Sequence, residues 1–372
     1  MWIAAFLCAV LLSVAVSRSL PTIDDESTLH AVVVLFRHGD RAPLSSWPND
    51  PYFSDLSLWP DGHGQLNNKG KRRHYELGQW FRERYVDWLP ARYNRSDLYV
   101  RSTDVDRTLM SAASNLAGLY RPSGDQLWSD DVTWQPIPIH TIPKAEDIVL
   151  RFDVDCKKYN LLTDQLNTRD DIVTLYREKD ELFRNLSLAT GYDKVDIGTT
   201  SSLFSTITIY RGENLSLPAW TDQYWSEIKS LAALDFKMGT YTPELTRLRV
   251  GPFFDYLLDH LYSVKAQALT GVGDDDHPKF LMLSAHDSTV APVADAMSVY
   301  NDAVPEFAST LLWEVRSRNE EFYLNVYFKN STHFEELTTR DCQIDCPLDD
   351  FATAMANATV DEDTWKQECD DV

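Results

Sequence analysis

The sequence predicts a mixed α/β fold, a mainly parallel sheet flanked by helices with an inserted, mostly helical cap domain. Three short apolar runs carry this prediction, and they lie at Ala31–Phe36, Leu98–Val100 and Phe280–Leu283. Continuous apolar runs are typical of strands buried on both faces, as in a parallel sheet covered by helices. A further stretch, residues 310–328, indicates two strands around a polar turn at 318–320, an antiparallel addition to the sheet.

Helical patterns separate these runs. Residues 69–89 place Leu77, Phe81 and Tyr85 at intervals of four, with charge on the opposite face. Residues 102–120 begin with Ser, Thr and Asp, which favour helix N-termini, so a helix is expected to begin directly after Arg101. Another apolar helical repeat covers residues 250–269. Together these patterns supply the helices that the buried strands require.

The chain divides into four predicted parts. Residues 1–17 are expected to be a signal peptide, because an apolar run from Trp2 to Val16 is followed by small residues suited to cleavage. A short membrane anchor or a buried helix is the alternative. Residues 22–145 and 246–372 form the two parts of the α/β domain. Between them, residues 146–245 mix charged and aromatic residues at helical spacing and are expected to form the cap.

The composition indicates an exported glycoprotein. The net charge is −22, which argues against a nucleic-acid or anionic-membrane partner, since both need basic faces. No later stretch reaches the roughly 18 apolar residues that would span a membrane. An even number of cysteines remains once Cys8 leaves with the signal, which favours disulfides but leaves alternative pairings open, and no zinc-binding spacing is present. Sequons for glycosylation begin at Asn94, Asn185, Asn214, Asn330 and Asn357.

Cationic and acidic residues follow each of the three apolar runs. Arg37, His38 and Arg41 follow the first, Arg101 the second, and the pair His286–Asp287 the third. If the strands are parallel, all of these side chains meet at the carboxyl edge of one sheet, where α/β proteins bind ligands. Arginine forks match the paired oxygens of phosphate or carboxylate, and this many cationic groups exceed what one carboxylate neutralises. A phosphate site is therefore predicted.

The same residues indicate a reaction. His38 stands among arginines, which disfavour its protonated form, so a neutral nitrogen is available to attack phosphorus. Asp287 is the candidate proton donor to the leaving group, and a donor carboxyl that must be protonated predicts an acidic optimum. Asp40 is expected to orient an arginine, while Asp106 and Arg107 are expected to make helix-start and packing contacts.

The motif RHGDRAP at residues 37–43 resembles the R-H-G-x-R-x-P signature of the histidine acid phosphatase family. The segments QLNNKG at 65–70, VRSTDVDRTLMSA at 100–112 and SAHDST at 284–289 agree with that family in the same order. The resemblance spans nearly the whole chain after the signal peptide. It is strongest to the animal secreted and lysosomal-type enzymes, and it implies an α/β sheet domain with a helical cap.

Residue roles follow from the resemblance. It implies that His38 becomes phosphorylated and that Asp287 donates the proton and then serves as base for the attacking water. The phosphoryl oxygens are expected to be held by Arg37, Arg41, Arg101 and His286. The resemblance also implies disulfides Cys156–Cys369 and Cys342–Cys346, no cofactor, and a homodimer as a possible assembly.

The expected activity is an exported acid phosphatase acting on small-molecule phosphomonoesters. Secretion is favoured over the lysosomal lumen, since the membrane segment of lysosomal members is missing. Two alternatives stay open at this point: a phytase-like phosphatase, whose cap residues the sequence does not locate, and a catalytically silent secreted binding protein or antigen.

Overall fold

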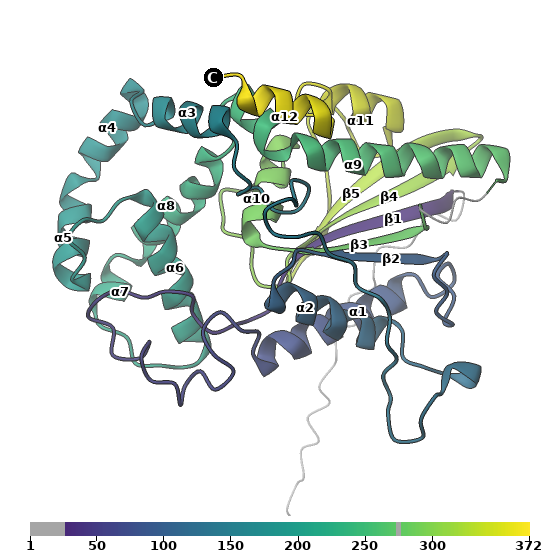
Figure 1. Ribbon diagram of the computed structural model, residues 1–372, viewed down its shortest axis with the longest axis horizontal. Helices are drawn as coiled ribbons and strands as arrows, with labels where there is room; N and C mark the ends of the chain where they lie inside the picture. The colour runs from purple at the N-terminus through teal and green to yellow at the C-terminus, as the bar shows by residue number, and fades with distance from the viewer. Residues whose placement is uncertain (1–26, 273–276) are drawn as a thin grey trace, which may run out of the picture.

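The computed structural model describes residues 27–272 and 277–372, which form one seven-stranded mixed sheet with helices on both faces (Figure 1). The strand order is β2-β3-β1-β4-β5-β6, and β7 pairs with β5. The strands are β1 (Thr28–Arg37), β2 (Leu98–Ser102), β3 (Phe280–Ala285), β4 (Thr310–Arg318), β5 (Glu321–Lys329), β6 (Phe334–Leu337) and β7 (Cys346–Pro347). The predicted fold class is confirmed, because β2, β3 and β1 are parallel and β4 and β5 form an antiparallel hairpin.

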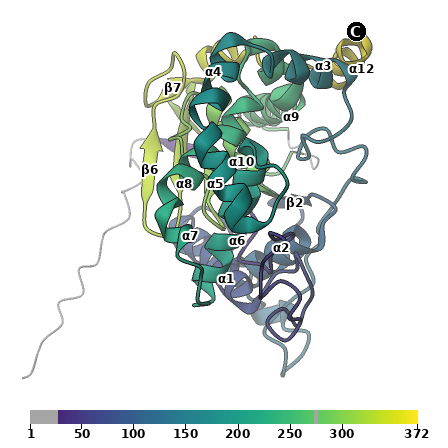
Figure 2. The ribbon, with the colours of Figure 1, turned by 90° about the vertical axis from the view of Figure 1, so that its left-hand side faces the viewer.

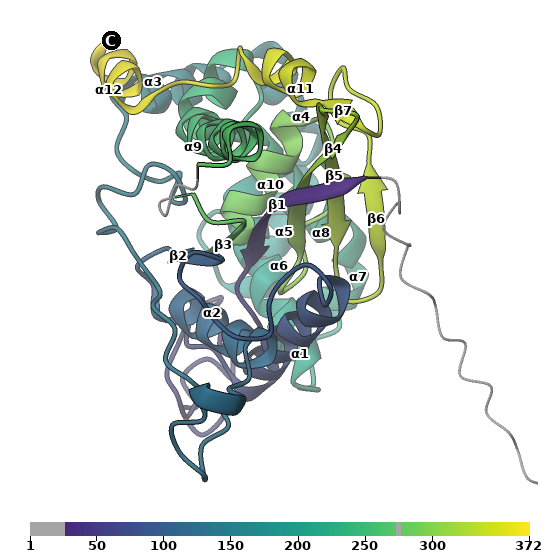
Figure 3. The same cartoon turned by 90° about the vertical axis from the view of Figure 1, so that its right-hand side faces the viewer.

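The alternation of side chains along β1 explains why both faces of the sheet are covered. Ala31, Val33 and Leu35 pack into one apolar cluster, and Val32 and Val34 pack into another on the opposite face. The first cluster includes side chains of α9 (Pro243–Thr270), α10 (Asp287–Ala296) and α11 (Leu348–Met355). The second includes α1 (Asn68–Arg84) and α2 (Asp106–Leu119). Figure 3 shows these two helical layers on opposite sides of the strands.

The α-helices between α2 and α9 lie mainly to one side of the sheet (Figures 1 and 2). They are α3 (Lys157–Leu166), α4 (Asp170–Glu178), α5 (Asp180–Thr190), α6 (Ile197–Gly212), the short α7 (Trp220–Gln223) and α8 (Trp225–Met238). Residues 146–245 contain no strand, all of them being described. The cap core joins Ile207 and Tyr210 of α6 to Trp47 and Trp59, which come from the loop after β1. The exact cap boundaries stay a prediction.

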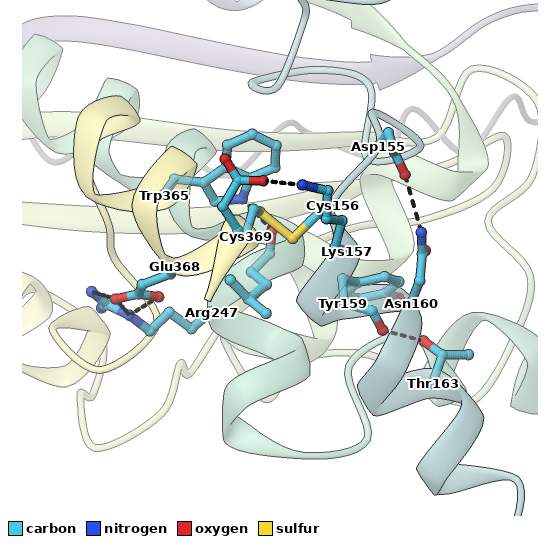
Figure 4. The surroundings of a disulfide bond; sticks show 12 residues. Asp155, Cys156, Lys157, Tyr159, Asn160, Thr163, Arg247, Trp365, Glu368 and Cys369 are labelled. Atoms are coloured by element: carbon cyan, nitrogen blue, oxygen red, sulfur yellow. Dashed lines mark hydrogen bonds and ion pairs between the residues drawn. A yellow bond between two sulfur atoms is a disulfide. The ribbon is translucent and has the colours of Figure 1, made fainter. Parts of the chain in front are cut away.

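Two disulfides tie the C-terminal region. Cys156 pairs with Cys369 and Cys342 with Cys346, the pairing that the resemblance implied. The first joins the start of α3 to α12 (Glu362–Asp370), beside an ion pair between Arg247 and Glu368 (Figure 4). The bridge therefore links the first cap helix to the end of the chain.

The remaining predictions concern the signal peptide, a membrane span, a metal site and the glycosylation sequons. The signal peptide lies outside the described residues. Within residues 27–272 and 277–372, no helix is long and apolar enough to cross a membrane, and no group of His, Cys, Asp and Glu side chains is suited to hold a metal ion. None of the five sequon asparagines is buried, and their glycosylation remains a prediction.

Candidate active site

The turn after β1 carries the candidate nucleophile. The backbone N–H of His38 donates to the carbonyl of Ala285 at the end of β3 (2.9 Å), so the turn continues the sheet edge. Gly39 lies against the backbone of Gly70 in α1, and a Cβ on Gly39 would come within 2.6 Å of the Gly70 carbonyl oxygen. Glycine at both positions permits this close approach, which fixes the turn on the N-terminal end of α1.

The hydrogen bonding of His38 defines its tautomer. Its Nδ1 lies 2.9 Å from the carbonyl oxygen of Gly39. A carbonyl oxygen only accepts, so Nδ1 carries the proton and Nε2 holds the free lone pair. Burial, together with the charges of Arg107, Arg37 and Arg41, holds the pKa of His38 well below its usual range. The imidazole is therefore neutral and nucleophilic at acidic pH.

Arg37 and Arg41 flank His38 and are held by different elements. Nη2 of Arg37 pairs with Oδ2 of Asp287 at 2.7 Å, and its guanidinium lies 4.2 Å from the centroid of the Phe307 ring. Nη2 of Arg41 donates to the Ser205 hydroxyl of α6 (3.2 Å), a contact between the turn and the cap. Burial and the charge of Arg37 lower the pKa of Arg41 to about 9. Two crowded guanidinium groups of this kind are well suited to an anion.

Arg107 of α2 lines the cavity that contains His38, whereas Arg101 of β2 does not, so the prediction for Arg101 does not fit this geometry. β2 extends through Ser102, and α2 begins only at Asp106. Arg101 is buried, and its Nη2 pairs with Asp147 at 2.5 Å. Arg107 lies in the first turn of α2, and its charge lowers the pKa of His38. The sequence predicts helix-start and packing contacts for Arg107; it does lie at the start of α2, but it also faces the site.

A buried hydrogen-bond chain orients His286. Nη2 of Arg107 lies 3.2 Å from Nδ1 of His286, and a guanidinium only donates, so Nδ1 accepts. Nε2 then carries the proton and donates to the hydroxyl of Thr103 at 3.0 Å. That hydroxyl lies 2.8 Å from the hydroxyl of Thr108. Burial and the charge of Arg107 lower the pKa of His286 to about 3, so it is neutral in the unliganded site.

Asp287 begins α10, next to His286. Burial raises the pKa of its carboxyl, but Arg37, Arg41 and His286 together outweigh burial, and the pKa lies below its ordinary value. In the unliganded site Asp287 is therefore ionised. Asp40 lines the larger cavity and accepts from Nε of Arg73 on α1 (2.6 Å), which agrees with a role in orienting an arginine.

Two cavities meet at Arg41 and Asp287, which line both. The smaller, of about 250 Å³, contains His38 and is lined by Arg41, Leu44, Val105, Arg107, Arg151, Phe152, Asp153, Arg249, His286, Asp287 and Ser288. The larger, of about 420 Å³, extends between the cap helix α6 and the segment 304–307. Arg37 lines this larger cavity. The structure thus brings together every predicted site residue except Arg101, and it adds Arg107. Arg151 and Arg249 lie in the wall of the smaller cavity.

Comparison with known proteins identifies the family of this chain. Residues 28–329 match the histidine phosphatase superfamily (branch 2). Bovine prostatic acid phosphatase is 34% identical over 350 residues, covering 92% of this chain and 87% of the relative. Human lysosomal acid phosphatase is 34% identical over 377 residues, covering 99% and 86%. The chain therefore belongs to branch 2 of the histidine phosphatase superfamily.

Solved structures show the same fold at lower identity. The phytase of Hafnia alvei in complex with tartrate superposes with a TM-score of 0.69 at 18% identity, covering 91% of this chain and 98% of that one. An inositol polyphosphate phosphatase of Bifidobacterium longum gives a TM-score of 0.58 at 12% identity, covering 93% and 96%. These likenesses support the α/β architecture with its helical cap.

Proposed function

We propose that this protein is an acid phosphatase that hydrolyses small phosphate monoesters through a phosphohistidine on His38. One observation carries the proposal: the proton on Nδ1 of His38 is held by the Gly39 carbonyl, so Nε2 is a free nucleophile among arginines. The acid phosphatase names of its relatives support the same activity.

The first step transfers the phosphoryl group. The lone pair of Nε2 of His38 forms a bond to phosphorus while the ester P–O bond breaks, and the departing oxygen takes a proton from Asp287. The phosphoryl oxygens are held by Arg37, Arg41, Arg107 and His286. The bound dianion favours uptake of a proton from solvent on Nδ1 of His286, which then donates to a phosphoryl oxygen, while Arg107 turns from Nδ1 to the phosphoryl group. In the second step, Asp287 accepts a proton from water as the water oxygen attacks phosphorus, the P–N bond breaks, and inorganic phosphate leaves.

Binding of substrate also explains how Asp287 obtains its proton. Arg37 and Arg41 hold its pKa low in the unliganded site. A phosphate dianion beside these arginines offsets their positive charge, so the pKa of Asp287 rises in the complex. The carboxyl is then protonated at acidic pH, which accounts for an acidic optimum of kcat.

The proposal includes the location of the protein and its assembly. The relatives include prostatic and lysosomal enzymes, which fits a secreted protein or one of the lysosomal lumen. Homodimer formation remains a prediction from the resemblance.

The full chain is to be assayed with p-nitrophenyl phosphate between pH 4 and 8, beside His38→Ala. We expect phosphate release that is greatest at acidic pH and absent from the variant. Full activity of His38→Ala would refute the nucleophile, and an inactive wild-type protein would favour the silent binding protein. Adding inositol hexakisphosphate to the substrate panel tests the phytase-like alternative.

A further inference from the structure

Arg249 of α9 lines the cavity that contains His38. It takes no part in the attack by His38 or in the proton transfer from Asp287. Its Nη1 donates to the hydroxyl of Tyr159 at 2.6 Å, and its Nε is buried without a hydrogen-bond partner. Among the described residues, no carboxylate forms an ion pair with it. Its charge lowers the pKa of the Asp235 carboxyl, but burial outweighs that effect. A half-buried guanidinium without a carboxylate partner raises the free energy of the folded protein unless an anion binds beside it.

The Arg249 guanidinium is held in a fixed place by two other elements. The hydroxyl of Tyr159, from α3, donates in turn to the carbonyl of Gly239 at the end of α8 (3.0 Å). A Cβ at Gly239 would lie 2.9 Å from Cζ of Arg249 and would displace the guanidinium. The side chain of Tyr159 on α3 and the backbone of Gly239 after α8 thus hold this guanidinium at the cavity wall.

Arg151 connects this cation to the phosphoryl site. Arg151 and Arg249 line the 250 Å³ cavity together and also share a small void behind it. The charge of Arg151 lowers the pKa of both Arg107 and His286, so it lies close to the phosphoryl-binding residues. Its partner is Asp153, whose side chain is 66% exposed. Asp153 accepts from both Nε and Nη2 of Arg151, but because its carboxylate is exposed, it remains in contact with water when a substrate anion displaces it from the guanidinium.

We propose that Arg151 and Arg249 form a second anion site, which binds a phosphate or carboxylate group carried by the same substrate molecule. The inference rests on the proposed phosphatase function and narrows its substrate class to small phosphomonoesters with a second anionic group. A cavity of about 250 Å³ limits the substrate to a small molecule.

Three homologous esters test the inference. Propane-1,3-diyl bisphosphate and 3-(phosphonooxy)propanoate carry a second phosphate or carboxylate, and 3-hydroxypropyl phosphate is the neutral control. We expect the wild-type protein to prefer the first two by kcat/KM. Arg249→Gln should lower kcat/KM for the anionic esters by roughly ten- to a hundredfold, as expected for loss of a charge-assisted contact, and change 3-hydroxypropyl phosphate by less than about threefold.

Arg247→Gln is the matched control, because Arg247 lies on the same helix but pairs with Glu368 outside the cavity. It should keep the wild-type preference. If Arg249→Gln does not fold, Arg151→Gln tests the same site and should also lose the preference. The ratio between the two anionic esters shows which group the site favours.

Several results would overturn the inference. One is a wild-type protein that hydrolyses the neutral ester at least as well as the anionic ones. Another is an equal loss for all three esters in Arg249→Gln or Arg151→Gln, which would mean a structural role only. Absence of hydrolysis of every ester, p-nitrophenyl phosphate included, would instead reject the proposed function itself.

Discussion

Replacing Arg107 with glutamine is expected to impair catalysis rather than folding. Arg107 donates a hydrogen bond to Nδ1 of His286. Among the charged groups that lower the pKa of His38, it has the largest effect. Removing one preorganised donor to a developing oxyanion costs about 10²–10³-fold in rate. We therefore expect kcat/KM for p-nitrophenyl phosphate to fall by about that factor, with little change in melting temperature.

The same variant should also shift the pH profile. Without the charge of Arg107, the pKa values of His38 and His286 both rise, because the guanidinium is the first charged group that lowers each of them. A larger fraction of His38 is then protonated at acidic pH and cannot attack phosphorus. The acid limb of kcat/KM should move to higher pH than in the wild type.

Arg101→Gln is the contrasting variant. Asp147 is fully buried, and Arg101 is its ion-pair partner. Breaking a buried pair from one side costs about 3 kcal/mol, which corresponds to a fall of about 4 °C in melting temperature for a chain of this size. Catalysis of the folded fraction should stay within about threefold of the wild type. A variant Arg107→Gln that stays fully active beside an inactive, stable Arg101→Gln would refute this assignment of roles.

Three further predictions concern the groups around His38. Asp287→Asn should lower kcat/KM, which reports only the steps up to release of the alcohol, by about 10²-fold for alkyl phosphates and much less for p-nitrophenyl phosphate, whose leaving group needs no proton; equal losses in kcat/KM would exclude proton donation. The decline of wild-type kcat as pH rises through the pKa of the complexed Asp287 should be absent from this variant. Thr103→Val should lower kcat/KM about tenfold and alter its pH profile, whereas Thr103→Ser, which retains the hydroxyl, should restore both; failure of the serine variant would argue for packing alone. Gly70→Ala places a Cβ 2.3 Å from a backbone oxygen in the turn of His38 and should lower kcat/KM by about 10²-fold, while Gly198→Ala, with ordinary contacts, should be active.

The strands could be predicted because their signal is local. The apolar runs at 31–36 and 280–283 are continuous, and both lie in the buried middle of the sheet. The position of the polar residues after each run, at the carboxyl edge of the sheet, then follows from the direction of the strands alone. The structure accordingly has His38, Arg41 and the pair at 286–287 lining one cavity.

The start of α2 could not be predicted from the same kind of signal. Ser102, Thr103 and Asp104 are all typical helix caps, but Ser102 ends β2 and Thr103 bonds to Thr108 and His286 instead. Tertiary hydrogen bonds overrode the local capping preference. That difference of four residues exchanged Arg101 for Arg107 at the site.

Arg151 and Arg249 lay beyond sequence reasoning for another reason. They lie almost a hundred residues apart in the sequence, Arg151 on a loop and Arg249 on α9. They line one cavity because the chain between them, which forms most of the cap, returns to the sheet domain. No spacing rule within one element connects them. The arrangement of the cap had to be known first.

The most direct test of the account is to trap the intermediate. The full chain is mixed with ³²P-labelled p-nitrophenyl phosphate at acidic pH, denatured within milliseconds, and digested under alkaline conditions that preserve phosphohistidine. We expect label on Nε2 of His38, about one equivalent at most, and no label in His38→Ala. Turnover with label on another residue, or in His38→Ala, would contradict it.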